Sequence, residues 1–542
     1  MNPIDKFIGW LSPAQGIRRA TARQALAAYE GGRSTSRRQK STDNSTGERQ
    51  VVRDAATVRA TMRDLERNHD LVRGALLALT RNVVGPNGVS IEPTPRKGGN
   101  ANDNTYDSIH DGFARELLIA FNEWAMRPEV TRTLDWVQAQ ELAFRSMARD
   151  GEAFAQLVEG TGTYIQHATS VPLSLELLEA DVVPLWYERD TPLVKAGIER
   201  NAWGQPTAYY AYKQHPGDGG WVNERALKRV PAQRFLHVAV RERLSGLRGI
   251  SLFASAIDRL MDIKDYEESE RVAANMAAKF AWQITRDPSM DWSLPPNPDG
   301  SEYMPGERQF QLRSGAIFDE LLPGEKIEIA NPNRPNPNLG EFRRQQLRAA
   351  SRPTCLTYST MAGDYDGTYS AQRQELVEAY AGYRMLTSQF VSQFVRPVWQ
   401  RFVEQAIASG RVRVPTDVRA DTVAQAQFRG PAMPWIDPSR EIGAIVDEVR
   451  AGVGSLTQKV AERGRRIQDV MEEIKREQVL ADELGIVLDT DARYVNQSGA
   501  AQSQATQNTP DTQEAARQRD TTQRQRAPRQ AHVRLVNPGD SE

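Results

Sequence analysis

Two carboxylates lie close together in Arg149-Asp150-Gly151-Glu152, where the pattern changes from helix to strand. A pair of carboxyl groups at such a turn can act as general acid and general base. Turn chemistry explains them equally well, because Asp-Gly is a common chain reversal. The sequence contains no GxxxxGK[ST] phosphate loop, no HExxH and no GxSxG. We therefore expect no catalytic residues and no enzyme; a monomeric hydrolase using Asp150 and Glu152 is the alternative.

Metal-binding patterns are equally weak. The six histidines are scattered singly, without the spacing that places two ligands on one helix face. Asp364-Tyr365-Asp366-Gly367 resembles the opening of a calcium loop, but the remaining ligand positions of that loop are missing. The single cysteine, Cys355, excludes an intrachain disulfide and a cysteine-rich zinc module, and we expect a buried structural thiol. We expect no metal and no cofactor.

Acidic residues crowd the middle of a long helix predicted over Ser251–Ile284. Three aspartates, spaced four and three residues apart, share one face of this helix: Asp258, Asp262 and Asp265. The stretch between Ile263 and Val272 is too charged for an ordinary core, because unpaired charges are costly to bury. We therefore expect water to face the middle of this helix.

A basic helix is predicted to return over Leu339–Ser351. It carries three arginines: Arg343, Arg344 and Arg348. These arginines can pair with the aspartates within one chain or between neighbouring subunits, and both arrangements are open at this point. Exposed ion pairs contribute at most about 1 kcal/mol each, so they would set register more than stability.

The elements that must position these residues form a mixed α+β pattern. The chain has 542 residues, enough for roughly three or four domains. Helices are expected over Asp54–Arg81, Tyr106–Trp124 and Leu134–Arg149, and strands between Ala153 and Val240. Its 69 basic and 70 acidic residues give a net charge of -1, so any contact with nucleic acid must be local. No apolar run approaches the roughly 18 residues that cross a bilayer, and we expect a soluble protein without a membrane partner.

The second half of the chain is also predicted to contain both helices and strands. A small β insertion is expected over Asp287–Asn338, followed by the basic helix and a loop rich in Gly, Asp and Tyr. A long helix over Ser370–Ala408 should kink at Pro397. Near the C-terminus, Ser455 and Gln458 can form a capping box for a helix to about Gln478. Beyond Asn496, large apolar residues are too rare for the tail to fold.

The ordered set of motifs resembles the portal proteins of tailed double-stranded DNA phages, in the lambda-like branch. The resemblance extends from about Arg18 to Leu488. It is carried by Arg81-Asn82-Val83-Val84-Gly85, Arg149-Asp150-Gly151-Glu152-Ala153-Phe154, Leu178-Glu179-Ala180-Asp181, Gly197-Ile198-Glu199, Val230-Pro231-Ala232 with His237, Leu247-Arg248-Gly249-Ile250-Ser251, Asp364-Tyr365-Asp366-Gly367-Thr368-Tyr369-Ser370-Ala371-Gln372-Arg373, and Trp435-Ile436-Asp437-Pro438 with Glu441.

The resemblance implies a dodecameric ring at one vertex of the viral capsid, assembled in the host cytoplasm. A terminase motor would pump double-stranded DNA through the central channel without sequence preference, and the genome would later leave by the same route. Implied partners are further copies of the chain, the terminase large subunit, the major capsid protein and scaffold, and the head-completion and tail adaptor proteins.

The resemblance also divides the chain into named parts. These are an N-terminal arm and linker (1–50), the first part of the wing (51–250), stem helix 1 (251–286), the clip (287–338), stem helix 2 (339–355), the tunnel loop (356–370), the second part of the wing with the long helix (371–430), a helical crown (431–490) and a disordered Gln/Arg-rich tail (491–542).

The functional residues follow from this division. We expect Asp258, Asp262 and Asp265 to line the channel, since a mostly repulsive wall lets DNA slide. The tunnel loop would present Tyr358, Asp364, Tyr365, Asp366 and Tyr369. Besides the monomeric hydrolase, a second alternative is a DNA-binding capsid scaffold or adaptor that uses its Arg-rich tail, Asn496–Glu542.

Overall fold

A computed structural model describes most of the chain. The described residues are 43–98, 107–161, 166–219, 222–279, 283–286, 325–328, 338–433 and 438–486 without 464 and 466, together with isolated positions near the two ends. Most of the expected N-terminal arm and β insertion, and the tail 492–542, lie outside them.

The chain divides into two compact units, the first comprising Met1–Gly454 with Glu462–Gly464 and the second Ser455–Ala461 with Arg465–Glu542. The first unit combines helices with small antiparallel sheets, so the expected mixed α+β class is confirmed. No helix among the described residues is long and apolar enough to span a membrane.

The helix predicted over Asp54–Arg81 is two helices, α3 (Gly47–Asn68) and α4 (Asp70–Val83). The break falls at His69, whose backbone is extended and whose N–H donates to the carbonyl of Leu65. A nitrogen of the buried His69 ring lies 3.2 Å from the carbonyl oxygen of Leu260. This contact with a residue far away in the sequence accounts for the break, which the apolar periodicity of the segment does not show.

Helices α5 (Asp111–Ala125) and α6 (Trp136–Asp150) follow, and their apolar faces join the main core. The central strand β2 (Glu152–Glu159) pairs antiparallel with β3 (Leu173–Glu179) and β8 (Phe235–Ala239). A second sheet has the order β4-β5-β6-β7. Its strands span Val194–Lys195, Ile198–Arg200, Pro206–Tyr212 and Leu227–Pro231.

The long helix predicted over Ser370–Ala408 has three parts. Helix α10 (Tyr369–Phe390) continues through a π-helical turn (Val391–Val395) into α11 (Arg396–Ala408). The wider turn directly precedes Pro397, which lacks an N–H and cannot make a regular helical hydrogen bond. Phe390 and Phe394 stack here, and Trp399 and Phe402 pack against Phe121 of α5.

Two short strands far apart in sequence complete this part of the molecule. Strand β1 (Ser90–Pro93) follows α4, and strand β11 (Ala426–Arg429) follows α11. They pair antiparallel, with Ile91 opposite Phe428. The pairing joins the N-terminal helices to the segment after the long helix.

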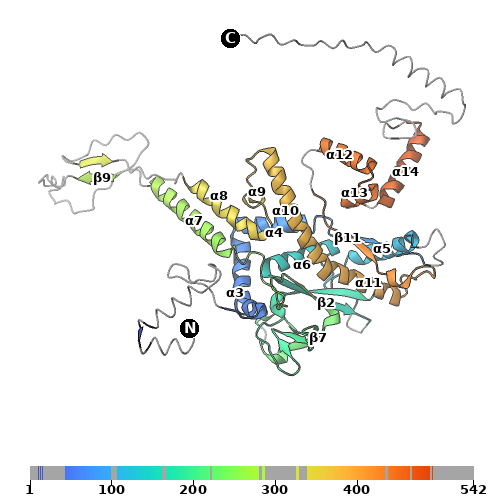
Figure 1. Ribbon diagram of the computed structural model, residues 1–542, viewed down its shortest axis with the longest axis horizontal. Helices are drawn as coiled ribbons and strands as arrows, with labels where there is room; N and C mark the ends of the chain where they lie inside the picture. Colours follow the sequence, from blue (N-terminus) through green and yellow to red (C-terminus); the bar gives the residue numbers. More distant parts are fainter. Residues whose placement is uncertain are drawn as a thin grey trace, which may run out of the picture. The chain divides into compact units, whose positions relative to one another are not determined.

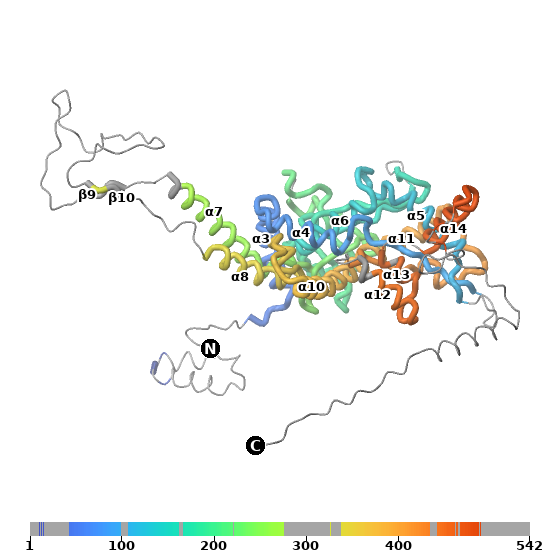
Figure 2. The backbone as a smooth tube through the Cα atoms, turned by 90° about the horizontal axis from the view of Figure 1, so that it is seen from above, coloured from blue at the N-terminus to red at the C-terminus, as the bar shows by residue number. Residues whose placement is uncertain are grey.

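Helix α7 (Ile257–Lys279) and helix α8 (Leu339–Ser351) lie side by side in Figure 1 and Figure 2. Helix α7 is shorter than the acidic helix predicted over Ser251–Ile284. Residues 252–256 form turns, the Ser251 hydroxyl before them bonds to the carbonyl of Ala148, and residues 283–284 belong to strand β9 (Gln283–Arg286). Strand β9 pairs antiparallel with β10 (Glu325–Glu328), the described part of the predicted β insertion.

The predicted C-terminal helices are also subdivided. Helix α12 (Pro438–Arg450) belongs to the first unit, and the second unit contains nearly all of α13 (Leu456–Glu462) and the whole of α14 (Ile467–Leu484). The Ser455 hydroxyl accepts a hydrogen bond from the Gln458 N–H at 3.1 Å, the half of the predicted capping box that starts α13.

Candidate functional site

The three aspartates of α7 lie on its exposed face. Asp258, Asp262 and Asp265 are all exposed, while Leu260 and Ile263 on the opposite side are buried. None of the three aspartates forms an ion pair within the described part of the chain. The structure therefore groups these residues into one acidic face that this chain leaves open to solvent.

The basic helix meets α7 on the other side. The Arg343 guanidinium donates to Glu267 at 2.6 Å, and Arg259 of α7 donates to Gln346 of α8 at 2.8 Å. The rings of Tyr266 and Phe342 pack with centroids 5.0 Å apart. The two helices are thus antiparallel and joined by opposite charges.

The partners differ from those that the charge pattern suggested. Within the described residues, Arg343, Arg344 and Arg348 do not pair with the three aspartates, which remain exposed. Arg343 pairs with Glu267 instead, whereas Arg344 and Arg348 face the segment that follows α8. Pairing between subunits remains a prediction.

The predicted range of the tunnel loop, 356–370, contains a short helix, α9 (Tyr358–Ala362), and Tyr369 is already the first residue of α10. Residues 356–357 and 363–368 of this range lack regular structure. Tyr365 and Tyr369 keep 64% and 46% of their surface exposed, and Asp366 is exposed as well. These three side chains are free to meet another molecule.

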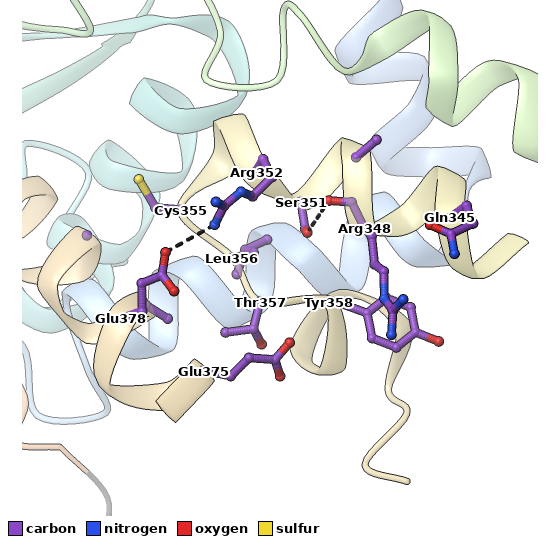
Figure 3. Close-up of a pocket in the computed structure, with 13 residues that line it drawn as sticks. Gln345, Arg348, Ser351, Arg352, Cys355, Leu356, Thr357, Tyr358, Glu375 and Glu378 are labelled. Carbon is purple, nitrogen blue, oxygen red and sulfur yellow. Dashed lines mark hydrogen bonds and ion pairs between the residues drawn. The ribbon is translucent and has the colours of Figure 1, made fainter. Parts of the chain in front are cut away.

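Tyr358 lies at the centre of a polar cluster, and Figure 3 shows one of its members, Arg348, beside the Tyr358 ring. The Tyr358 hydroxyl donates to the Asp364 carboxylate at 2.7 Å, and the Arg348 guanidinium lies 5.3 Å from the ring centroid. Burial, followed by the hydrogen bond to Asp364, raises the pKa of Tyr358. The bonds from Tyr358 and from the Asp366 N–H lower the pKa of Asp364. Two predicted loop residues and the basic helix are therefore brought together.

A groove of about 520 Å³ lies beside this cluster, between α8, the following turn and α10 (Figure 3). Its walls carry one arginine of α8, one arginine of the following turn and two carboxylates of α10. They are Arg348, Arg352, Glu375 and Glu378. Cys355 also lines the groove and is half-buried, less than the buried thiol expected; burial still raises its pKa.

The candidate catalytic pair has a different environment. Glu152 is fully buried, and its carboxylate accepts hydrogen bonds from Arg248, Arg59 and the Gly249 N–H, with His237 3.0 Å away. Burial alone would raise the pKa of Glu152, but the charge of Arg248 and the bonds from His237 and Arg248 hold it well below its usual range. A carboxylate saturated in this way is suited to holding structure together, and not to exchanging protons with a substrate.

Asp150 belongs to the same network. It is buried between Arg63 and Arg149, at 2.8 and 2.7 Å. Arg59 and Arg63 also reach Asp181, and Arg59 pairs with Glu152 of β2, so α3 is tied to the sheet. The sequence motifs around residues 149–152, 178–181, 237 and 247–251 thus meet at one place. Sequence reasoning missed the contribution of α3, although the four-residue spacing of Arg59 and Arg63 within an amphipathic helix was a usable signal.

One group of possible metal ligands occurs in the described residues, formed by Glu179, Asp181 and His215. The Arg63 guanidinium lies 3.2 Å from Glu179 and 2.6 Å from Asp181. The positive charge that a cation would supply is therefore already present, and the donor set does not favour a metal.

Comparisons with known proteins place these features in a family. The model of the lambda family of phage portal proteins matches residues 32–386. A probable portal protein of Halomonas phage phiHAP-1 is 23% identical over 457 residues, covering 80% of this chain and 82% of that protein.

Two solved structures are more distant. A chain in the virion of a native gene transfer agent particle is 13% identical, with a TM-score of 0.43 and coverage of 75% of this chain and 92% of that one. An HK97 family phage portal protein from Corynebacterium diphtheriae is 11% identical, with a TM-score of 0.27 and coverage of 72% and 97%. On the family match over most of its length, the chain belongs to the lambda family of phage portal proteins.

Proposed function

We propose that twelve copies of this chain form a ring at one capsid vertex and that double-stranded DNA passes through its centre, inward during packaging and outward during ejection. The observation that carries this proposal is the acidic face of Asp258, Asp262 and Asp265. All three carboxylates are exposed on a helix whose other face is held by α8. Ring closure would place twelve such faces around one axis.

The charge of this face suits a conduit. DNA held by many arginines and lysines gains affinity from counterion release and would resist sliding. A wall of carboxylates repels the phosphates and keeps water between protein and DNA. The exposed side chains Tyr365, Asp366 and Tyr369 offer contact without the side-chain pattern that reads base edges.

The partners proposed from the family are the terminase large subunit, the major capsid protein and scaffold, and the head-completion and tail adaptor proteins. In this proposal residues 287–338 would dock the motor and later the head-completion proteins, and residues 251–286 with 339–355 would form the stem. The remaining named parts, the wing, tunnel loop and crown, keep the ranges given above.

The first test is the mass and symmetry of the purified full chain. Native mass spectrometry should give twelve times the chain mass of 60.7 kDa, and negative-stain images should show a ring with a central hole. A particle that stays monomeric at high concentration would contradict the proposal.

The second test addresses the channel face. The double variant Asp262→Lys/Asp265→Lys should form rings but package DNA at least several-fold more slowly in an assay with the cognate motor. Glu188→Lys/Asp190→Lys makes the same charge change at exposed positions elsewhere and is the matched control. Equal packaging by both variants would remove the acidic face from the channel.

A further inference from the structure

The chain turns sharply where α8 ends. The 3-10 turn Arg352–Thr354 is followed by Cys355 with a φ of 61°, and Thr357 then caps α9. The turn folds α9 back beside α8, so that Tyr358 at the start of α9 faces arginines one and two helical turns before the end of α8. The position of Tyr358 is thus set by the backbone of the turn.

Three side chains converge on Tyr358. Arg348 stacks over its ring, and Arg344 lies close enough to its hydroxyl for the two groups to shift each other's pKa. The same hydroxyl donates to Asp364, the first residue after Gly363. Tyr358 is therefore the link between two cations of α8 and one anion of the loop.

The far side of the loop is tied to α10. The Gln372 side chain donates to the carbonyl of Tyr365, and the Ser359 hydroxyl donates to Glu375 at 2.5 Å. Gly363 has a φ of 66°, which lets the backbone reverse directly after α9. The bond from Gln372 thus ties Tyr365 to α10, and the bond from Tyr358 to Asp364 ties the loop on the side of α8.

We propose that Tyr358 is a positioning residue that latches residues 363–368 to α8, and that phosphates of the DNA backbone open this latch by binding Arg344 and Arg348. The proposal rests on the function proposed above, which brings DNA to this loop. The Tyr358 latch comprises Arg344, Arg348, Tyr358 and Asp364.

The chemistry favours such an exchange. Arg344 and Arg348 are both exposed, so a phosphate can reach them without unfolding the chain. A guanidinium binds a phosphate through paired, charge-assisted hydrogen bonds, which are stronger than the proximity of Arg344 to a phenol hydroxyl or the contact of Arg348 with a ring face. When the arginines turn to phosphate, Tyr358 loses its stacking partner and Asp364 loses the nearby positive charge. The groove beside Tyr358 leaves space into which the side chains can move.

Hydrogen exchange of the purified full chain, read by mass spectrometry, tests the latch without DNA. Tyr358→Phe removes only the hydroxyl and should speed exchange of the Asp364 and Asp366 amides by about five-fold, the effect of one hydrogen bond. Tyr365→Phe removes a hydroxyl from an exposed ring in the same loop and should leave these rates unchanged. Asp364→Asn should resemble Tyr358→Phe and replaces it if that variant fails to fold. Unchanged rates in both latch variants would overturn the proposal.

Duplex DNA of random sequence tests the second part of the proposal, the opening of the Tyr358 latch by phosphates. It should speed exchange of the same amides in the wild-type chain and have no such effect in Arg344→Gln/Arg348→Gln. Faster exchange in that variant too, or unchanged or slower exchange in the wild type, would overturn the role of the phosphates. Because the DNA-free arm requires neither a ring nor packaging, its result is independent of the particle images that test the proposed function.

Discussion

Arg248 donates hydrogen bonds to both carboxylate oxygens of Glu152, and both side chains are completely buried. The next residue, Gly249, donates its backbone N–H to the same carboxylate at 3.1 Å. Arg248 and Gly249 lie a few residues before α7. The bonds between Arg248 and Glu152 therefore anchor the segment that leads into the acidic helix to strand β2.

Removing the positive charge of Arg248 should strongly lower the unfolding free energy of the chain. Arg248→Met leaves the buried Glu152 charge without its main partner, which costs about 3–5 kcal/mol of unfolding free energy. Denaturant unfolding of the purified chain measures it. Arg352→Met breaks an exposed pair with Glu378 and should cost less than about 1 kcal/mol. The double variant Glu152→Gln/Arg248→Met should recover part of the loss. If its loss of unfolding free energy equals the sum of the losses measured for Glu152→Gln and Arg248→Met alone, the two side chains are not coupled.

Stability should fall on acidification in two steps. Burial lowers the pKa of His237, outweighing the nearby Glu152, while Arg248 and Arg241 act in the same direction as burial. Because the folded His237 resists protonation, its contribution is lost as pH falls below the ordinary histidine value of about 6.5. Glu152 has a strongly lowered pKa, so its contribution is complete above the ordinary glutamate value of 4.5 and is lost as pH falls below it.

Denaturant midpoints measured from pH 8 to pH 3 check this order. His237→Asn should remove the upper step and keep the lower one. A wild-type midpoint that rises between pH 7 and pH 5 would contradict a lowered pKa of His237 in the folded chain.

Gly151 and Gly204 form a matched pair for testing backbone crowding. Both have a positive φ, 88° and 81°, but a Cβ at Gly151 would overlap the backbone of Ile250, whereas a Cβ at Gly204 meets nothing within 4 Å. Gly204→Ala should cost only the conformational strain, about 1 kcal/mol. Gly151→Ala should cost several times more and lower the yield of folded protein. Similar melting temperatures for the two variants would show that the close approach is absent.

The contact between α7 and α8 should be weak in energy but specific in position. Glu267→Gln removes the charge that pairs with Arg343 in a partly exposed pair, so we expect a loss of about 0.5–1 kcal/mol. Asp262→Asn, five residues earlier on the open face, should leave the unfolding free energy unchanged. Equal losses in the two variants would place Asp262 in a contact that this chain does not show.

Local patterns in the sequence determined much of the fold. Apolar periodicity predicted most helices within a few residues, and the hydroxyl of Ser455 caps the predicted helix start. The opposite charges of the two helices around the β insertion were also visible. These features depend on neighbours three or four residues away, which a sequence displays directly.

Only the tertiary structure decided which side chains meet. Glu152 is separated from Arg248 by 96 residues and from Arg59 by 93, so no spacing rule connects them, and two candidate catalytic carboxylates proved to be buried ion-pair partners. Likewise, Arg343 bonds Glu267 because α7 packs with one particular face against α8, leaving the aspartates outside. Such pairings follow from how whole elements pack, since helix rotation and strand register select the partner of each charge from many local candidates.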